Sequence, residues 1–482
     1  MHPAIIVRIL GFLLMGYSIA LVPPVFVSFI YSDNSHFAFI IPFFITFTCG
    51  ALLWLVSRKR KESLRTRDGF IITALFWTVL GLFGSMPFML AEQPGLSFTD
   101  AVFESLSGLT TTGATVLAEI DGLPHSILFY RQFLQWFGGI GIIVIAMAIL
   151  PLLGVGGMQL YRAEAPGPVK DSKLTPKIAE TAKALISIYI SLTISCCLAY
   201  WIAGMNFFDA IGHAFSTVAI GGFSTHTASM GYFDSPAILL VAIFFMVFSG
   251  INFSLHFFAW KARRFHHYLR DAESRFYFFC LLNGTFITVL YLFTTDYYDF
   301  TTSFLYGSFQ VVSLVTTTGF GIDDFSAWPL FLPFMLFIGA FMGGCANSTA
   351  GGMKVIRVLL VVKQGLREIQ RLIHPNAIIP IKVGNKVVSD RVIEAVWGFF
   401  AVYIFVFILM LLALLATGLD FLTAFSAVGA CINNLGPGLG EVAAHYGQIN
   451  TPAKWVLCFA MLLGRLEVFT LLVLFTPMFW RR

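Results

Sequence analysis

The sequence has little charge for its length. Only 11% of its 482 residues are Asp, Glu, Lys or Arg, and 58% are hydrophobic. A water-soluble protein of this size needs far more charge to cover its surface, so the composition indicates an integral membrane protein. No basic segment with a small-residue cleavage site precedes the first apolar run. We therefore expect that run to be retained rather than removed as a signal peptide.

Signals for catalysis and for cofactors are also missing. The chain has no Walker motif and no GxGxxG after a strand, so we expect it to bind no nucleotide. An intramembrane enzyme acting on lipid is disfavoured, because there is no HExxH motif and the histidines His213, His226 and His256 are scattered. The seven cysteines lie in apolar surroundings without metal-ligand spacing, which predicts core residues and no disulfide framework. We expect neither an enzyme nor a bound cofactor.

Long apolar runs recur along the chain. A helix needs about 20 apolar residues to cross a bilayer, and ten runs reach that length. The fold class predicted is an all-α integral membrane protein with ten transmembrane helices. The predicted spans are residues 4–30, 37–57, 70–91, 128–155, 184–204, 235–260, 276–295, 329–365, 392–417 and 453–480.

The basic residues predict the orientation of these spans. Lysine and arginine gather in the loops on one side, whereas the opposite loops carry mainly aspartate and glutamate. The positive-inside rule then places both chain ends in the cytoplasm. This bias also explains the net charge of +5, which therefore gives no reason to expect a nucleic acid partner. The basic segments are 58–67, 170–183, 261–275, 363–391 and 481–482.

Four short amphipathic segments each end on a glycine and precede a long apolar run. At about a dozen residues they are too short to cross a bilayer, which predicts re-entrant helices. The segments are 99–111, 208–219, 302–316 and 421–433. Their ends read Thr110-Thr111-Thr112-Gly113, Ala219-Ile220-Gly221-Gly222, Thr316-Thr317-Thr318-Gly319 and Asn433-Asn434-Leu435-Gly436.

The repeated glycine indicates an ion pore. The first two copies align without a gap, so that Asp209 matches Asp100, and both aspartates stand where a carboxylate can cap a helix N-terminus. The opposite helix ends would carry partial negative charge inward and stabilise a cation. Glycine permits backbone angles that turn carbonyls toward an axis. Helix packing alone is the alternative for any single glycine, but four copies favour a filter.

The predicted span 329–365 is too long for one straight crossing. Its middle contains four glycines and several small polar residues, which should break the helix and leave a loop lining a cavity. We interpret this loop as a gate beneath the filter, with a polar kink between packed helices as the alternative. It comprises Gly343, Gly344, Cys345, Ala346, Asn347, Ser348, Thr349, Ala350, Gly351 and Gly352.

Arg465 lies deep in the last span. An arginine at the bilayer centre costs roughly 2.5–3.5 kcal/mol on insertion scales, so we expect it to face the pore cavity as an electrostatic barrier to the gate. Glu467 is two residues away, a spacing that does not place two side chains face to face on a helix, so we expect it to bind elsewhere. The alternative is a buried pair of Arg465 with Glu104 or Glu467.

Taken together, these residues resemble the Trk/Ktr/HKT superfamily of cation transporters. The strings GGCANSTAGGMK, at 343–354, and GRLEVFTLL, at 464–472, look like family signatures, and the resemblance covers the whole chain. The two extra N-terminal spans are similar to the TrkH branch. The fold implied has four span–pore helix–span repeats around one pore. The predicted units are a two-helix extension, 1–66, and repeats 67–165, 166–272, 273–385 and 386–482.

The resemblance also implies what the protein does and with what it assembles. Glycine in all four filter positions implies potassium, held near Thr111, Ile220, Thr317 and Asn434. The fourth stretch departs from the threonine pattern and should make the pore less symmetric. The family implies a homodimer in the lipid of the bacterial inner membrane, and a TrkA-like cytosolic ring that binds nucleotides. The candidate surfaces for that ring are the basic loops 162–183, 261–275 and 363–391.

We therefore expect a potassium uptake channel or transporter gated by the intramembrane loop and the cytosolic subunit. Two transport alternatives stay open. The chain could be the pore-bearing subunit of an ATP-driven potassium pump, although the N-terminal spans and GRLEVFTLL disfavour this. It could also couple potassium to protons or sodium, because the intramembrane carboxylates Glu104 and Glu467 have no assigned role.

Overall fold

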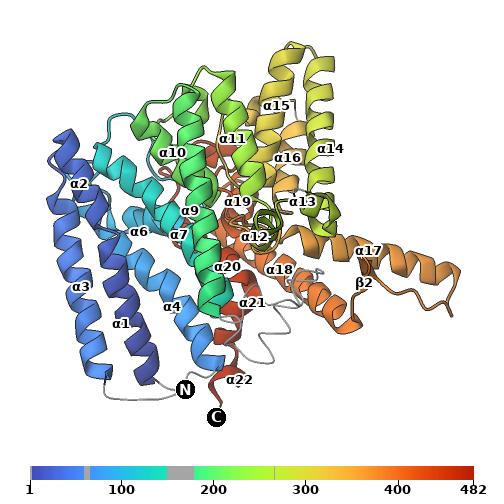
Figure 1. Cartoon of the computed structure of the whole chain (residues 1–482), viewed down its shortest axis with the longest axis horizontal. Helices are drawn as coiled ribbons and strands as arrows, with labels where there is room; N and C mark the ends of the chain where they lie inside the picture. The colour runs from blue at the N-terminus through green and yellow to red at the C-terminus, as the bar shows by residue number, and fades with distance from the viewer. Residues whose placement is uncertain (1–2, 59–65, 149–177, 265, 330, 482) are drawn as a thin grey trace.

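The computed structural model describes residues 3–58, 66–148, 178–264, 266–329 and 331–481 (Figure 1). The predicted boundary at 165/166, the basic residues at 59–65 and 170–177, and the end of the predicted span 128–155 lie outside the described residues. Both chain ends lie at the same end of the molecule, as expected for an even number of crossings.

The described chain is built almost wholly of helices. The N-terminal extension contains α1 (Pro3–Ile19), α2 (Val22–Tyr31) and α3 (Phe37–Ser57). The first repeat follows with α4 (Thr66–Gly84), α5 (Met86–Leu90), α6 (Phe98–Leu109) and α7 (His125–Ala148). The second comprises α9 (Ile178–Ile202), α10 (Phe207–Ala219), η2 (Ser229–Tyr232), α11 (Pro236–Ser249), α12 (Phe253–Ala262) and α13 (His266–Arg270).

The C-terminal half repeats this order. It begins with α14 (Ala272–Thr294), α15 (Phe300–Val315), η3 (Phe325–Ala327), α16 (Phe331–Ala340) and α17 (Val355–Ile373). A small antiparallel hairpin of β1 (Lys382–Val383) and β2 (Lys386–Val387) follows, with Lys382 opposite Val387. The last part contains α18 (Asp390–Ala416), α19 (Phe421–Ile432), η4 (Gly440–Val442), α20 (Thr451–Arg465), α21 (Glu467–Leu472), η5 (Val473–Phe475) and α22 (Pro477–Trp480).

By length and composition, the described residues contain fewer candidate membrane spans than the ten predicted. Among the described residues, six helices are long and apolar enough to cross a bilayer, and eight if each of two bent pairs is one span. The count of ten therefore stays a prediction. The predicted span 329–365 is broken between Ala340 and Val355, where the glycine-rich sequence lies.

Two spans predicted to be continuous are bent. The chain turns by 97° between α11 and α12, and by 107° between α20 and α21. At the first bend Gly250 ends α11 and the Asn252 side chain caps α12 by accepting from the amide of Ser254. At the second, Glu467 adopts a φ of 53°. Hydropathy did not reveal either bend, because each bent pair of helices is together long and apolar enough to pass as one span.

The re-entrant helices form the core of the molecule. Every residue of α6 from Ala101 to Leu109 is buried, as are the last seven residues of α15 and of α19. The surrounding helices instead expose large apolar side chains, for example Phe279, Leu282 and Phe286 on α14. This distribution fits a protein whose outer surface meets lipid and whose polar residues face inward.

The caps of the first two re-entrant helices differ from the prediction. The N-cap residues are Ser97 and Asn206, and each side chain accepts from the amide of the aspartate three residues later. Asp100 and Asp209 in turn bind those cap side chains, at 2.8 and 2.6 Å. The aspartates therefore hold the cap side chains in place rather than act as the caps. In the other two copies an aspartate is the cap, at Asp299 and Asp420.

Candidate functional site

Each re-entrant helix ends in the same backbone turn. In the first copy, the amide of Thr112 donates to the carbonyl of Ser107 at 2.8 Å and that of Thr111 to Gly108 at 3.0 Å. This pair of bonds is the Schellman arrangement that closes many helix C-termini. It recurs at the equivalent positions as Gly221–Ser216 with Ile220–Thr217, Thr318–Ser313 with Thr317–Leu314, and Leu435–Ala430 with Asn434–Cys431.

The turn places a non-glycine residue in the left-handed region in all four copies. This position of the Schellman arrangement is usually glycine, yet here the φ angles of the four residues are 53°, 54°, 66° and 53°. Strain of this kind costs about 1–3 kcal/mol per residue and gathers at functional sites. The residues are those for which the sequence predicted cation contact: Thr111, Ile220, Thr317 and Asn434.

The glycines that follow form a closed ring. A Cβ atom added to Gly113 would lie 2.1 Å from the carbonyl oxygen of Gly221, the residue before the next glycine of the series. The same relation holds around the ring, at 2.1 Å from Gly222 to Thr318, 2.0 Å from Gly319 to Leu435 and 2.8 Å from Gly436 to Thr112. Because the fourth copy faces the first, the four stretches surround one axis.

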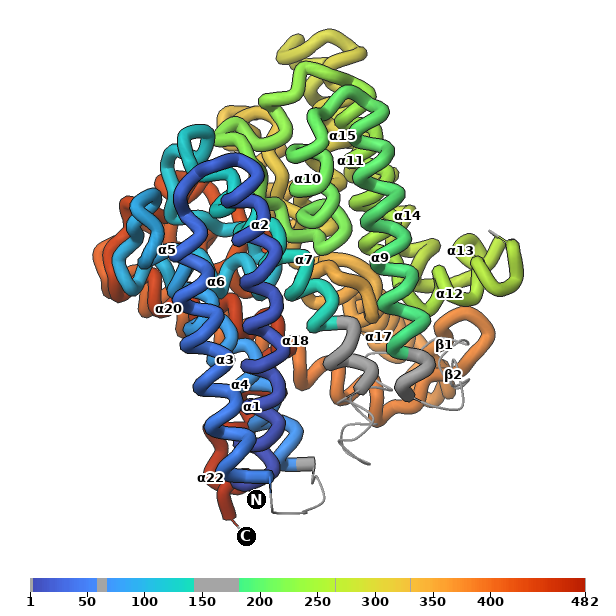
Figure 2. The backbone as a smooth tube through the Cα atoms, turned by 60° about the vertical axis from the view of Figure 1, so that its left-hand side comes forward, coloured from blue at the N-terminus to red at the C-terminus, as the bar shows by residue number. Residues whose placement is uncertain are grey.

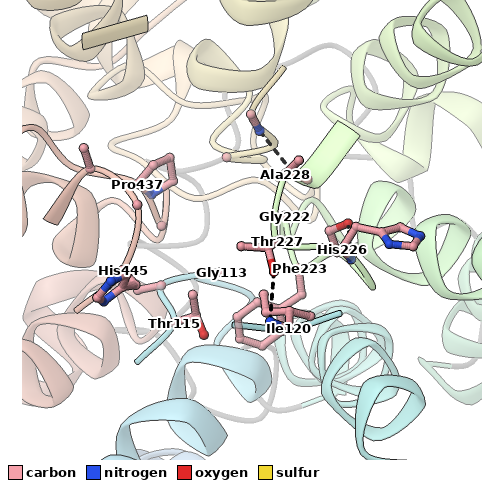
Figure 3. A pocket seen from close by; sticks show the side chains of 18 of the residues that line it. Gly113, Thr115, Ile120, Gly222, Phe223, His226, Thr227, Ala228, Pro437 and His445 are labelled. Carbon is pink, nitrogen blue, oxygen red and sulfur yellow. Dashed lines mark hydrogen bonds between the residues drawn. The ribbon is translucent and has the colours of Figure 1, made fainter. Parts of the chain in front are cut away.

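The ring opens into a cavity of about 510 Å³. All four glycines line it, and Figure 3 shows Gly113, Gly222 and Pro437 around one space, contributed by the blue, green and red parts of the chain. Asp323 and Asp324 also line this cavity and are exposed. A hydrated cation could reach the glycine ring from here, and the carboxylates would favour it over an anion.

We call the extended segments that contain the four ring glycines the strands of the ring. A buried ion pair holds the first of them, just after Gly113. Glu104 on α6 and Arg131 on α7 are both fully buried and meet at 2.8 Å. Glu104 also accepts from the amide of Val116 and the hydroxyl of Thr115, each at 3.0 Å. Arg131 reaches the second copy by donating to the carbonyl of Ser224 at 3.2 Å. A charge at this depth is tolerable because both partners and their hydrogen bonds are satisfied.

Histidines and an aspartate hold the second strand. His213 binds the hydroxyl of Ser224 at 2.8 Å, and Asp209 accepts from Thr225 at 2.6 Å. His226 lies between Asp209 and Asp121 of the first repeat, at 3.1 and 2.8 Å. Burial disfavours the charged imidazole, but the hydrogen bonds and charges of the two carboxylates outweigh it, so the pKa of His226 is raised.

The second and fourth strands have different outer supports. Gln135 on α7 donates to the carbonyl of Gly221 at 2.6 Å and accepts from the amide of Phe223 at 3.1 Å. In the fourth copy the carbonyl of Gly436 instead accepts from the hydroxyl of Tyr446 at 2.7 Å. Two threonine hydroxyls of the predicted filter are used within their own helices, since those of Thr110 and Thr316 donate to carbonyls four residues back.

The glycine-rich loop lies directly under three of the four helix ends. The hydroxyl of Thr349 donates to the carbonyl of Val218 at 2.9 Å, and the amide of Gly351 donates to the hydroxyl of Thr317 at 2.7 Å. The amide of Gly352 donates to the carbonyl of Asn433 at 3.0 Å. The loop therefore occupies the place where an ion would leave the ring.

Arg465 joins the loop to the first copy. Its guanidinium donates to the hydroxyl of Thr111 at 2.7 Å and to the carbonyl of Thr349 at 3.1 Å. It pairs with neither of the carboxylates considered above, because Glu104 binds Arg131 and Glu467 binds Arg357 of α17 at 2.6 Å. Glu467 thus binds elsewhere, as its spacing from Arg465 indicated.

Comparisons with known proteins agree with this geometry. Residues 35–482 match the family model described as TrkH, cation transport protein. The chain is 58% identical to the Trk system potassium uptake protein TrkH of Halomonas elongata, and 55% identical to that of Escherichia coli K12. The two alignments cover 99% and 100% of both chains. The crystal structure of the potassium transporter TrkH from Vibrio parahaemolyticus superposes with a TM-score of 0.93 at 53% identity, covering 100% of both chains.

The chain belongs to the TrkH family of cation transport proteins. The resemblance inferred from the sequence is therefore confirmed. In this family member all sixteen residues of the predicted filter lie at the four helix ends, and the predicted gate residues 343–352 lie beneath them. Their roles as filter and gate are taken up below as proposals.

Three supporting residues of this TrkH-family site were not singled out from the sequence. They are Arg131, Gln135 and Tyr446. A signal was present for the first two, because polar residues four apart inside an apolar span are functional candidates by default. Tyr446 lies in an irregular loop, where the sequence gives no register.

Proposed function

We propose that the protein is a potassium-selective uptake pathway, a channel or gradient-driven transporter. Cations would enter from the cavity, lose water at carbonyls of the four helix-end strands and pass the level of Thr111, Ile220, Thr317 and Asn434. The observation that carries the proposal is the closed ring of four glycines, in which each strand presents its carbonyl to the next. The potassium named for relatives that match over the full length agrees with it.

The glycine-rich loop would be the gate of this pathway. It is bonded to the second, third and fourth helix ends, and through Arg465 to the first. An ion leaving the ring would therefore meet backbone and a guanidinium instead of water. Opening requires those bonds to break, which makes the loop a two-state element whose balance a partner could change.

The partner would act from the cytoplasm. In the proposed orientation the two chain ends are cytoplasmic and the membrane is the bacterial inner membrane. The pair Arg357–Glu467 connects the first turn of α17 to the residue two after Arg465. In Figure 1 the far end of α17 projects from the body beside the hairpin. A TrkA-like ring that moved α17 could thus act on the loop, and the protein would function as a homodimer.

The test is cation flux in proteoliposomes that contain this chain alone. We expect uptake of potassium and rubidium over sodium, and loss of that preference in Gly113→Ser, because the added side chain meets the Gly221 carbonyl. Gly122→Ser is the matched control, since a Cβ atom there has nothing within 4 Å. Unchanged selectivity in Gly113→Ser would overturn the filter.

A second variant tests the gate. Deletion of 345–350 should raise potassium flux, because it removes the bonds of Thr349 to Val218 and Arg465. Absence of any increase in a folded variant would reject the loop as the barrier. If the intact chain conducts nothing, this deletion also separates a closed gate from a pump subunit, since only the gated pore should open.

A further inference from the structure

A lateral groove lies between α9 and the α12–α13 segment. Its volume is about 600 Å³, and a smaller hollow of about 280 Å³ continues it along the same two helices. The bend of 97° after α11 creates the groove, because it turns α12 away from the line of the span. Figure 2 shows α12 and α13 at the edge of the molecule beside α9.

The floor of the groove is apolar and preformed. The rings of Phe248, His256 and Tyr268 cluster together, with the Phe248 and Tyr268 ring centroids 6.0 Å apart. His256 is fixed at both ring nitrogens, to the Tyr268 hydroxyl at 2.8 Å and the Phe248 carbonyl at 3.0 Å. Ile188 and Leu192 of α9 form the facing wall. No polar group of this floor needs a ligand, so its remaining surface fits hydrocarbon.

The mouth of the groove is strongly basic. Arg263 and Arg264 line it, both exposed, and Lys261 lines the adjoining hollow. Among the described residues neither guanidinium pairs with a carboxylate, and none of the residues that line the two hollows is acidic. Guanidinium groups bind phosphate oxygens with two parallel hydrogen bonds, so this mouth suits a phosphate group.

We propose that this groove binds one anionic phospholipid of the inner leaflet. The phosphate would lie at Arg263 and Arg264, and an acyl chain would lie along Ile188 and Leu192 over Phe248. Basic pockets between helices on the cytoplasmic side are a known type of lipid site. Trp260 is 64% exposed at the rim, in the amphipathic position typical of the membrane interface. The side assigned to the groove rests on the proposed orientation.

The groove lies under the elements that carry the proposed gate. The carbonyl of Gly250, at the bend, accepts from the amide of Cys345 at 2.8 Å, and the amide of Phe253 donates to Asn347 at 3.1 Å. A bound lipid that holds α12 in place would therefore hold two anchors of the loop. Lipid binding does not require the loop to be a gate, so an experiment that rejects one of these two proposals leaves the other standing.

The test is retention of lipid by the full chain in detergent, measured by native mass spectrometry. Dioleoylphosphatidylglycerol and dioleoylphosphatidylcholine are added in equal amounts. We expect one tightly held phosphatidylglycerol per chain and about a tenfold weaker retention in the double variant Arg263→Gln/Arg264→Gln, as the loss of charge-assisted hydrogen bonds predicts. Arg275→Gln/Arg391→Gln removes two exposed cytoplasmic-side charges elsewhere and should behave as the parent. Equal retention of both lipids, or equal loss in both double variants, would overturn the proposal.

A photo-crosslinking residue identifies the occupant directly. Ser195 lines the groove and is exposed, so benzoylphenylalanine placed there should crosslink to lipid in vesicles of phosphatidylethanolamine and phosphatidylglycerol. A crosslink to a second copy of the chain would make the groove a subunit interface and reject the lipid site. Size-exclusion chromatography of each variant establishes that it is folded.

Discussion

Three strands of the glycine ring are tight and the fourth is loose. An added Cβ atom at Gly113, Gly222 or Gly319 would meet the next strand's carbonyl at 2.0–2.1 Å, whereas at Gly436 the nearest oxygen lies at 2.8 Å. The fourth strand is also the one whose sequence departs from the threonine pattern, with Asn434 and Pro437 beside its glycine. The wider distance and the different sequence occur in the same strand. A strand that is held by its own side chains need not keep the same distance to its neighbour as the other three. The four turns are therefore equivalent although the walls around the ring are not.

The largest expected effect comes from alanine at the ring. Gly113→Ala, Gly222→Ala and Gly319→Ala force a methyl group into a carbonyl at a positive φ, at a cost of at least about 1–3 kcal/mol. We expect the preference for potassium over sodium to fall roughly tenfold or more, with a smaller loss in Gly436→Ala. Flux with each ion checks this, and Gly122→Ala is the control. Equal loss at all four positions would remove the distinction between the strands.

We expect loss of the second strand's support to reduce selectivity more than loss of the fourth strand's support. Gln135→Met removes two bonds and leaves the amide of Phe223 buried without a partner, a cost of about 1–3 kcal/mol. Tyr446→Phe removes one bond to Gly436 and should cost about 1 kcal/mol. Rubidium-to-sodium flux ratios measure both, with Tyr291→Phe as a control, since no hydrogen bond of its hydroxyl is found among the described residues. A greater loss in Tyr446→Phe would reverse the comparison.

The loop below the ring is held by side chains at the second and third strands and by backbone at the fourth. Thr349→Val keeps the shape of the residue but removes its bond to the Val218 carbonyl, worth about 1 kcal/mol. We expect basal potassium flux to rise by about fivefold. Thr288→Val is the matched control, because the buried Thr288 hydroxyl has no partner in the described structure. A flux that stays at the parent value would show that this anchor does not restrain the loop.

The smallest expected effect concerns the first two strands, which His226 ties together at the cavity wall. The pKa of His226 is raised by Asp209 and Asp121. The ion pairs of the charged imidazole therefore stabilise the fold fully below the unfolded pKa of about 6.5, and this stabilisation is lost as pH rises through the folded pKa. The thermal stability lost in His226→Gln should therefore be largest at acidic pH. His374→Gln, far from these carboxylates in sequence, should show no such trend. A loss that grows with pH would contradict the ion pairs.

Much of the architecture was predictable because membrane insertion leaves a simple record in sequence. The apolar runs, the four short segments, their terminal glycines and the break near Gly343–Gly352 could all be read from composition and spacing. The bends after α11 and α20 could not, because each bent pair of helices still passes as one apolar span by length and composition. The capping of α6 and α10 was misplaced by three residues, because the sequence offers both Ser97 and Asp100 and only the backbone path selects between them.

Four equivalent segments that each end in a glycine, within a membrane protein of one family, can be recognised from the amino-acid sequence alone. The reason is that the lipid phase demands apolar spans, and that a backbone at positive φ against a neighbouring carbonyl leaves no room for a Cβ atom. The folded chain, in contrast, sets which carbonyl each glycine faces, pairs Arg465 with Thr111 rather than with a carboxylate, and brings Glu467 to Arg357 on α17. Those contacts join residues far apart in the chain, and their partners are chosen by packing geometry, which local sequence does not encode.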